Sequence, residues 1–395
     1  MLPWPDEKGA YSLQYVPIHS LKDRQKVHGD VAHMSVNPSI RGDSYRAEDP
    51  KARLAKISEG KYVPEDTTTT ALYTVYAHTE RLQELERQLG LQDLIPYPRK
   101  IGVEVNVRID GEKEDNNGFY LGELDVTIYS RYSLNKLSTA FNAGLIAHEH
   151  FHAIFWHLVS KDLDTQFIAL DTRNMDEEVL QKKALKIHRS NLFYLRAYNE
   201  GLADLWANIY TGQDRFLNKS LSKNKDNPFR DFHPGRSLYK YQNKKMKAYK
   251  AHDLMLSKKE KYQPGAEAYR HGFHIAYLLR SKMLRDLNVK LAASSKESGK
   301  LLMAEYVINF LYKLRKMLKE NLQYGLDEND ILPLIYEQDN KEDCKVVKNI
   351  APDYLQFLSH CYRNFPDLEE NEEPQEVKVK LIHKVNDGQD KKEGI

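Results

Sequence analysis

The sequence predicts an α+β fold on three observations. Strands are indicated by alternating apolar residues in the segment Lys100–Ile109 and by a run of β-branched and aromatic residues in Phe119–Tyr129. The segment Gly144–Leu158 is apolar on several sides, which is typical of a buried helix. Beyond residue 176, apolar residues recur at helical spacing in one segment after another. We therefore expect a β-rich N-terminal lobe, a central helix and a helical C-terminal lobe.

Four regions are expected along the chain. Residues 1–95 form an irregular, proline-punctuated region with one amphipathic helix, residues 68–90, that stops at Gly90. Residues 96–165 carry the strands and the central helix. Residues 166–365 form a helical lobe whose lysine-rich part, residues 213–265, is expected to be a solvated insertion. Its helices are expected from 176 to 212, 266 to 287, 299 to 322, 329 to 338 and 351 to 362. Residues 366–395 are dense in charge and poor in aromatic residues, so we expect a disordered tail.

Composition narrows the class of protein. The chain has 395 residues, 41% apolar and 29% charged, which is ordinary for a globular protein with a substantial core. A net charge of +2 argues against a nucleic-acid binder, and no apolar run is long enough for a membrane span. The absence of a CxxC pair argues against a thiolate zinc site. Cys344 and Cys361 form either one disulfide or two buried thiols.

The N-terminal sequence, MLPWPDEKGAYS, has neither the basic nor the apolar part of a signal peptide. Two locations stay open. We expect export, periplasmic or secreted, with the signal outside this sequence, and the cytoplasm is the alternative. The sequence predicts no oligomeric state.

The central helix carries an HExxH motif, with His148, Glu149 and His152. Residues four apart lie one above the other on a helix, so His148 and His152 can present two imidazoles to one metal ion. Glu149 lies on the same turn, where it can act as general base toward an activated water. A pair of core histidines is the structural alternative, and a third ligand would decide against it.

Glu200 is the expected third ligand. A catalytic zinc site of this kind uses two histidines and one glutamate and leaves a fourth position for water. Asp204 follows one turn later, where its carboxylate can accept the free N–H of a metal-bound imidazole. An acidic, solvated helix face is the alternative, but the helix around these carboxylates is largely apolar.

Two other zinc motifs are excluded by inspection. The elongated motif HExxHxxGxxH needs a glycine and a histidine where Phe155 and Leu158 stand. The inverted motif HxxEH needs a histidine at Ile146. His157 is badly placed for the same ion, and His150 is expected to pack or hydrogen-bond away from the ligand face.

With HExxH followed by NExxxD, residues 199–204, the chain resembles the gluzincin metallopeptidases, most closely the thermolysin-like branch. The resemblance covers roughly residues 100 to 285. It implies a zincin-type fold with one Zn²⁺ ion and a peptide or protein substrate. Asn117-Gly118-Phe119-Tyr120 is similar to the family's edge strand, which implies that Asn117 and Gly118 contact the substrate backbone.

The chain departs from the family in three places. The interval between His152 and Glu200 is longer than in thermolysin, and the GxMEN signature of the related aminopeptidases is absent. The family's transition-state histidine has no exact counterpart. Aligned on Gly272, residues 269–272 resemble the aminopeptidases' YxxG element, which implies Tyr269 as the oxyanion donor. His271 and His274 are the alternatives.

The expected function is hydrolysis of peptide bonds by a zinc-activated water, with Glu149 as the general base. Two alternatives belong to other classes. One is a non-catalytic zincin scaffold that binds a protein or cell-wall polymer. The other is a metal-dependent hydrolase of a peptidoglycan cross-link, for which the lysine-rich insertion would suit an anionic polymer.

Overall fold

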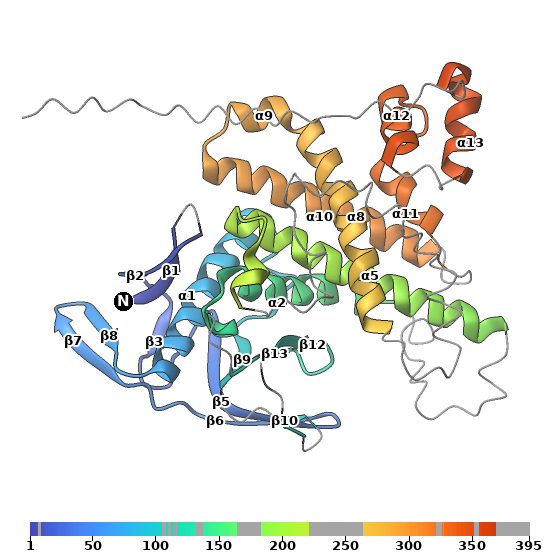
Figure 1. Cartoon of the computed structure of the whole chain (residues 1–395). Coiled ribbons are helices and arrows are strands. Elements are labelled where there is room, and N and C mark those ends of the chain that lie inside the picture. The colour runs from blue at the N-terminus through green and yellow to red at the C-terminus, as the bar shows by residue number, and fades with distance from the viewer. Residues whose placement is uncertain are drawn as a thin grey trace, which may run out of the picture. The chain divides into compact units, whose positions relative to one another are not determined.

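A computed structural model describes residues 1–6, 9–104, 108–109, 112–113, 115, 117–131, 137–163, 183–220, 264–320, 326, 328–350 and 355–368. The chain forms two compact units, Met1–Tyr336 and Glu337–Ile395. Strands dominate the N-terminal part of the first unit and helices the remainder of the chain, which confirms the predicted mixture of α and β structure (Figure 1).

The prediction of an irregular region before residue 65 is wrong, because this region contains short strands. Two hairpins pair β1 (Leu2–Pro5) with β2 (Tyr11–Gln14) and β7 (Leu54–Ser58) with β8 (Lys61–Pro64). Between them lie β3 (Leu21–Asp23), β4 (His28–Gly29), β5 (Ala32–Arg41) and β6 (Ser44–Glu48). The prolines are tolerated because they stand at strand ends, as Pro5 and Pro64 do, or at a register shift, as Pro38 does.

The main sheet joins this region to the predicted strands. Its described strands run in the order β11 (Glu112–Lys113), β10 (Arg108–Ile109), β5, β9 (Arg99–Glu104), β13 (Val126–Ser130) and β12 (Gly118–Leu121). β9 is parallel to both of its neighbours, whereas β12 pairs antiparallel with β13 at the end of this order. The segments predicted as two strands are therefore four. Of these four, β13 is buried along its whole length.

Two capped helices pack on this sheet. Asp66 caps α1 (Thr67–Gln88) by accepting from the backbone N–H of Thr69, and Gly90 takes a positive φ just after its end. The 3₁₀ turn η1 (Thr139–Phe141) leads into α2 (Ala143–Phe155), whose Asn142 cap accepts from the amides of Gly144 and Leu145. A π-helical turn, η2 (Trp156–Ser160), extends α2.

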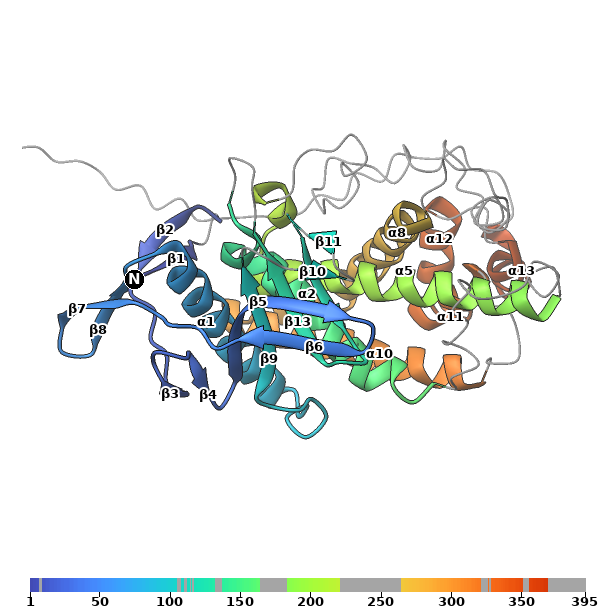
Figure 2. The ribbon, with the colours of Figure 1, turned by 90° about the horizontal axis from the view of Figure 1, so that it is seen from below.

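All thirteen residues of α2 are buried, as the apolar sequence predicts. α2 packs against α1, β12 and α5 (Lys183–Thr211), and it lies between the strands and α5 in Figures 1 and 2. The burial of a helix that carries three histidines and a glutamate requires that each polar side chain find a partner.

The other helices among the described residues of the first unit are α8 (Pro264–Asp286), α9 (Asn288–Ala292), α10 (Lys296–Glu320) and α11 (Glu328–Ile335), with the 3₁₀ turn η4 (Phe216–Lys219) after α5. They match the predicted helices except for the short α9. The predicted beginning of the helix at 176 and most of the lysine-rich insertion lie outside the described residues. No helix in the described ranges is long and apolar enough to cross a bilayer.

The second unit contains α12 (Lys341–Ile350), α13 (Leu355–Asn364) and the turn η5 (Pro366–Leu368). A disulfide joins Cys344 of α12 to Cys361 of α13, which resolves the two readings of this cysteine pair. The boundary after Tyr336 falls inside the region predicted as one helical lobe, and the tail beyond residue 368 lies outside the described residues.

Helices α5 and α8 approach so closely that their backbones touch at two glycines. A Cβ on Gly201 would overlap the carbonyl group of Gly272, and a Cβ on Gly272 would overlap the carbonyl oxygen of Ala197. Any larger residue at either position would have to separate the two helices. The crossing therefore fixes the position of α8 along the part of α5 that carries Glu200.

We expect the Gly272→Ala substitution to lower the free energy of unfolding by about 1–3 kcal/mol, since the added methyl group meets backbone atoms. Gly299→Ala in α10 is the matched control, because a Cβ there meets its nearest atom at 3.5 Å, an ordinary contact. The control should be neutral or stabilise by about 0.5–1 kcal/mol through helix propensity. Urea unfolding of both variants measures the difference. Equal stabilities would contradict the close crossing.

Candidate metal centre

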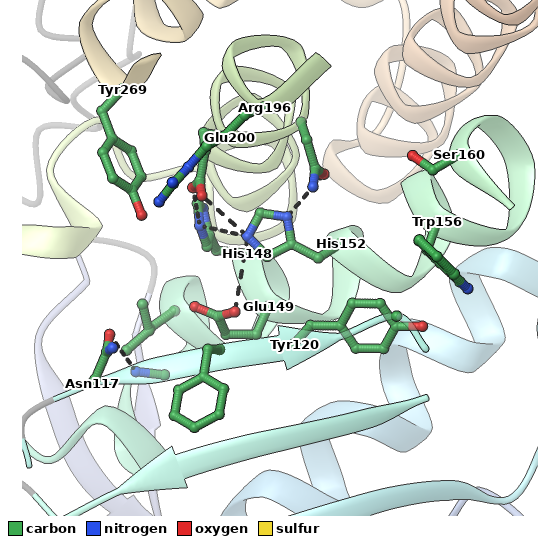
Figure 3. A pocket seen from close by; sticks show the side chains of 15 residues that line it. Asn117, Tyr120, His148, Glu149, His152, Trp156, Ser160, Arg196, Glu200 and Tyr269 are labelled. Atoms are coloured by element: carbon green, nitrogen blue, oxygen red, sulfur yellow. Dashed lines mark hydrogen bonds and ion pairs between the residues drawn. The ribbon is translucent and has the colours of Figure 1, made fainter. Parts of the chain in front are cut away.

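Three side chains from two helices converge in the first unit. Nε2 of His148 lies 3.2 Å from Nε2 of His152, and both nitrogens face Oε2 of Glu200, at 3.4 Å and 3.7 Å. The two imidazoles come from α2 and the carboxylate from α5, as Figure 3 shows. The three residues predicted as ligands thus form a group that could hold one metal ion.

Hydrogen bonds on the far side of each ring fix which nitrogen faces the cluster. Nδ1 of His148 lies 3.0 Å from Oδ1 of Asp204, a carboxylate that is almost fully buried. Nδ1 of His152 lies 2.9 Å from Oδ1 of Asn199. Because both oxygens accept hydrogen bonds, the proton of each neutral ring is placed on Nδ1 and the lone pair on Nε2. The contact predicted for Asp204 is present, and Asn199 provides a second one.

Glu149 stands beside this cluster. Its Oε2 lies 3.8 Å from Nε2 of His152, and a Cβ on Gly118 would lie 3.3 Å from its Cγ and Oε1, so the edge strand runs alongside the carboxylate. Tyr129 is buried close to Glu149, and burial and then the charge of Glu149 raise the pKa of its phenol far above the usual value. Tyr129 is therefore held neutral, and its hydroxyl donates to the carbonyl of Ile146 at 3.4 Å.

An open cavity of about 370 Å³ lies over the cluster. Its lining comes from the edge strand, α2, η2, α5 and α8: Asn117, Gly118, Phe119, Tyr120, Gly122, Leu145, His148, Glu149, His152, Trp156, Ser160, Arg196, Asn199, Glu200 and Tyr269. A cleft this size can take a few residues of an extended chain beside the cluster.

The edge strand β12 supplies one wall. The backbone N–H and C=O of Asn117 are bonded to the hydroxyl and backbone of Ser130, at 2.7 Å and 2.9 Å, and the side chain of Asn117 accepts from the N–H of Gly118. Both residues predicted to contact substrate therefore lie on the cavity wall, beside Glu149.

Aromatic residues bound the side of the cavity beyond His152, where Figure 3 shows Tyr120 and Trp156. Oδ1 of Asp125 accepts from the hydroxyl of Tyr120 at 2.7 Å and pairs with Arg99 at 2.8 Å and with His157 at 3.4 Å. Burial alone would raise the pKa of Asp125, but the hydrogen bond from His157 and the charge of Arg99 outweigh burial and bring this pKa to about 2. This ionised carboxylate ties the β12–β13 turn to η2.

Of the three candidates for the oxyanion donor, Tyr269 lies in the cavity wall and the two histidines are not among the lining residues. His271 is buried against the rings of Phe193 and Tyr194, with centroids 5.9 Å and 5.1 Å away. Burial lowers the pKa of His271 to about 3 and that of His274 to about 4, so both rings are neutral. The structure therefore places His271 in the packing of α5 against α8, not in the cavity.

The other two histidines of this region lie away from the cluster, as the sequence predicts. Nε2 of His150 lies 2.5 Å from Oε1 of the buried Glu86, whose other oxygen accepts from the hydroxyl of Tyr97 at 2.5 Å. His157 faces Asp125. His150 therefore joins α2 to α1, and His157 joins η2 to the β12–β13 turn.

Several cavity residues were missed by the sequence analysis. Asn199 adjoins Glu200, and Arg196 precedes it by one helical turn, so the helix period could have indicated both. Trp156 and Ser160 follow the motif by four and eight residues. Their place in the wall depends on the π-helical turn, which cannot be predicted from the sequence pattern.

Comparison with known proteins adds no relative: no protein-family model matches the chain, and no curated protein matches it significantly.

We expect the Asp204→Ala substitution to weaken zinc binding by about 10- to 100-fold, because it removes the acceptor that orients His148. Glu200→Ala should weaken binding further, since it removes a ligand. Competition with a chromogenic chelator measures both affinities. The control is Asp43→Ala, which removes a carboxylate from an exposed turn. An unchanged affinity in Asp204→Ala would contradict the orienting role.

Proposed function

We propose that this chain is a zinc-dependent peptidase related to the thermolysin-like gluzincins. The observation that carries the proposal is the convergence of His148, His152 and Glu200, with Glu149 alongside, under a cavity bordered by a sheet edge. An edge strand can pair with an extended peptide, which would bring a backbone carbonyl of the substrate over the cluster.

The donor set fits zinc. Two imidazole nitrogens and one carboxylate oxygen are the ligands of many catalytic zinc sites. Bond lengths of roughly 2.0–2.2 Å in tetrahedral geometry require donors about 3.3–3.6 Å apart, and the three spacings here are 3.2, 3.4 and 3.7 Å. The lone pairs of both Nε2 atoms, fixed by Asp204 and Asn199, point to the same place.

The side chains have separate roles in the proposed reaction. A bound zinc ion supplies Lewis acidity, which acidifies water and polarises the scissile carbonyl. Glu149 accepts a proton from the attacking water and passes it to the leaving amine nitrogen. Tyr269 donates its hydroxyl hydrogen bond to the oxyanion that develops on the carbonyl oxygen. Asn117 and Gly118 hold the substrate backbone at the edge strand.

The Glu149→Gln substitution tests the proposal. The variant should bind zinc as the unaltered protein does but cleave unfolded casein about 10²–10⁴-fold more slowly, because it cannot take the proton. A chelator should abolish cleavage by the unaltered protein, and added zinc should restore it. Zinc binding with no cleavage of any peptide or protein would instead favour a non-catalytic scaffold, and turnover of isolated cell-wall sacculi alone would favour a peptidoglycan hydrolase.

A second prediction concerns the oxyanion donor. Tyr269→Phe should lower kcat by about 10²-fold or more with little change in zinc affinity, since the hydroxyl acts on the transition state. Tyr277→Phe, on the same helix but outside the cavity lining, is the matched control. Steady-state kinetics on one peptide give both values. A Tyr269→Phe variant as active as the control would exclude the assigned role.

A further inference from the structure

We propose that Arg196 forms a subsite for a carboxylate of the substrate, so that the enzyme prefers peptides with a negative charge within about two residues of the cleaved bond. This inference rests on the proposed peptidase function. The carboxylate can be the C-terminus of a short peptide or the side chain of an aspartate or glutamate.

Arg196 is an exposed residue in a buried stretch of α5. The residues on either side of it in α5, Phe193, Tyr194, Leu195, Ala197 and Tyr198, are all buried, with exposed fractions of 8% or less. Arg196 is exposed and lines the cavity together with Asn199 and Glu200 on the same helical face. Its guanidinium therefore faces the space that the substrate would occupy.

Arg196 is held in place by an aromatic contact. Its Cζ lies 5.8 Å from the ring centroid of Tyr269, within the range of a cation–π contact. The glycine crossing of α5 and α8 fixes the two helices against each other one turn from these residues. Figure 3 shows Arg196 and Tyr269 beside Glu200, on the side of the cluster away from Trp156. An arginine stacked on a ring keeps the edge of its guanidinium available for hydrogen bonds.

Arg196 brings a positive charge to a cavity wall that is otherwise acidic. Arg196 is the single lysine or arginine among the described residues that line the cavity, whereas Glu149 and Glu200 line it and Asp204 lies just behind His148. A guanidinium one turn from a metal ligand repels a divalent cation, so it does not assist metal binding. With a bound Zn²⁺ ion the three carboxylates would leave a net charge of −1 at the cluster, and Arg196 offsets the repulsion of an anionic substrate at one place in the wall. A planar guanidinium binds a carboxylate through two parallel hydrogen bonds.

The distance between Arg196 and Glu200 limits where the substrate carboxylate can lie. Four residues of helix separate Arg196 from Glu200, which is about 6 Å along the axis. An extended peptide advances roughly 3.3–3.6 Å per residue. The charge must therefore lie within about two residues of the bond that is cleaved over the metal cluster.

The experiment compares randomised pentapeptide mixtures with a free C-terminus and with a C-terminal amide, digested by the zinc-loaded protein and followed by mass spectrometry. Within each mixture, peptides with aspartate or glutamate are compared with those carrying asparagine or glutamine. We expect kcat/KM to favour the carboxylate by roughly 10- to 100-fold in at least one of the two comparisons. The comparison that shows the preference identifies the source of the charge.

The substitutions Arg196→Gln, Arg196→Lys and Arg41→Gln then assign the preference. Arg196→Gln should bring the ratio close to one, and Arg196→Lys should keep part of it as a point charge. Arg41→Gln removes the same charge from an exposed strand end and should keep the full ratio. Equal cleavage of all peptides by the unaltered protein, or an unchanged ratio in Arg196→Gln, would overturn the inference.

Peptide-binding measurements on a protein that cannot cleave distinguish a failure of the subsite from a failure of the proposed function. The same peptides are titrated into the zinc-loaded Glu149→Gln protein, with and without Arg196→Gln. If no peptide is cleaved but carboxylate peptides bind more tightly and lose that advantage in Arg196→Gln, the subsite stands and the peptidase proposal fails. If peptides are cleaved and bound without preference, the peptidase proposal stands and the subsite fails.

Discussion

The arrangement depends on one constraint: a completely buried helix, α2, carries three histidines, each of which needs a polar partner. His148 and His152 satisfy it on one face through Asp204 and Asn199 of α5. On another face His150 satisfies it through Glu86 of α1, which also holds Tyr97. Because an unpaired buried polar group costs roughly 1–3 kcal/mol, these pairs fix both the rotation and the depth of α2 between its neighbours.

The same pairing orients the chemistry. An acceptor on each Nδ1 leaves two Nε2 lone pairs directed at one point, and the carboxylate of Glu200 completes the set from the helix that supplies the acceptors. Ligand and orienting residue thus come from one rigid element, α5. Any movement of α5 therefore carries Glu200, Asp204 and Asn199 together relative to the two histidines of α2.

The sequence predicted those parts of the site whose relative positions are set by the period of a single helix. His148, Glu149 and His152 are fixed relative to one another by a single helix, and Glu200 and Asp204 by another. The sequence did not decide between Tyr269 and His271 as the oxyanion donor. Residues two positions apart on a helix point about 200° apart, so these two cannot both face one cavity. The deciding information is the contact of Gly272 with α5, which is a tertiary contact. The N-terminal strands escaped prediction because their pairing, as of β5 with β9, joins residues far apart in the chain.

The two sides of the cavity are attached to different parts of the fold. The aromatic side, with Tyr120 and Trp156, is tied through Asp125 to the β12–β13 turn and to η2. The side with Arg196 and Tyr269 is tied to the crossing of α5 and α8. α2 packs against both η2 and α5, and it carries His148, Glu149 and His152, whereas Glu200 comes from α5. Changes in either wall can therefore alter what the cavity accepts while the pairing that orients His148 and His152 is left in place. The aromatic wall is therefore separable from the residues that serve the chemistry, whereas the wall with Arg196 shares α5 with Glu200, Asp204 and Asn199.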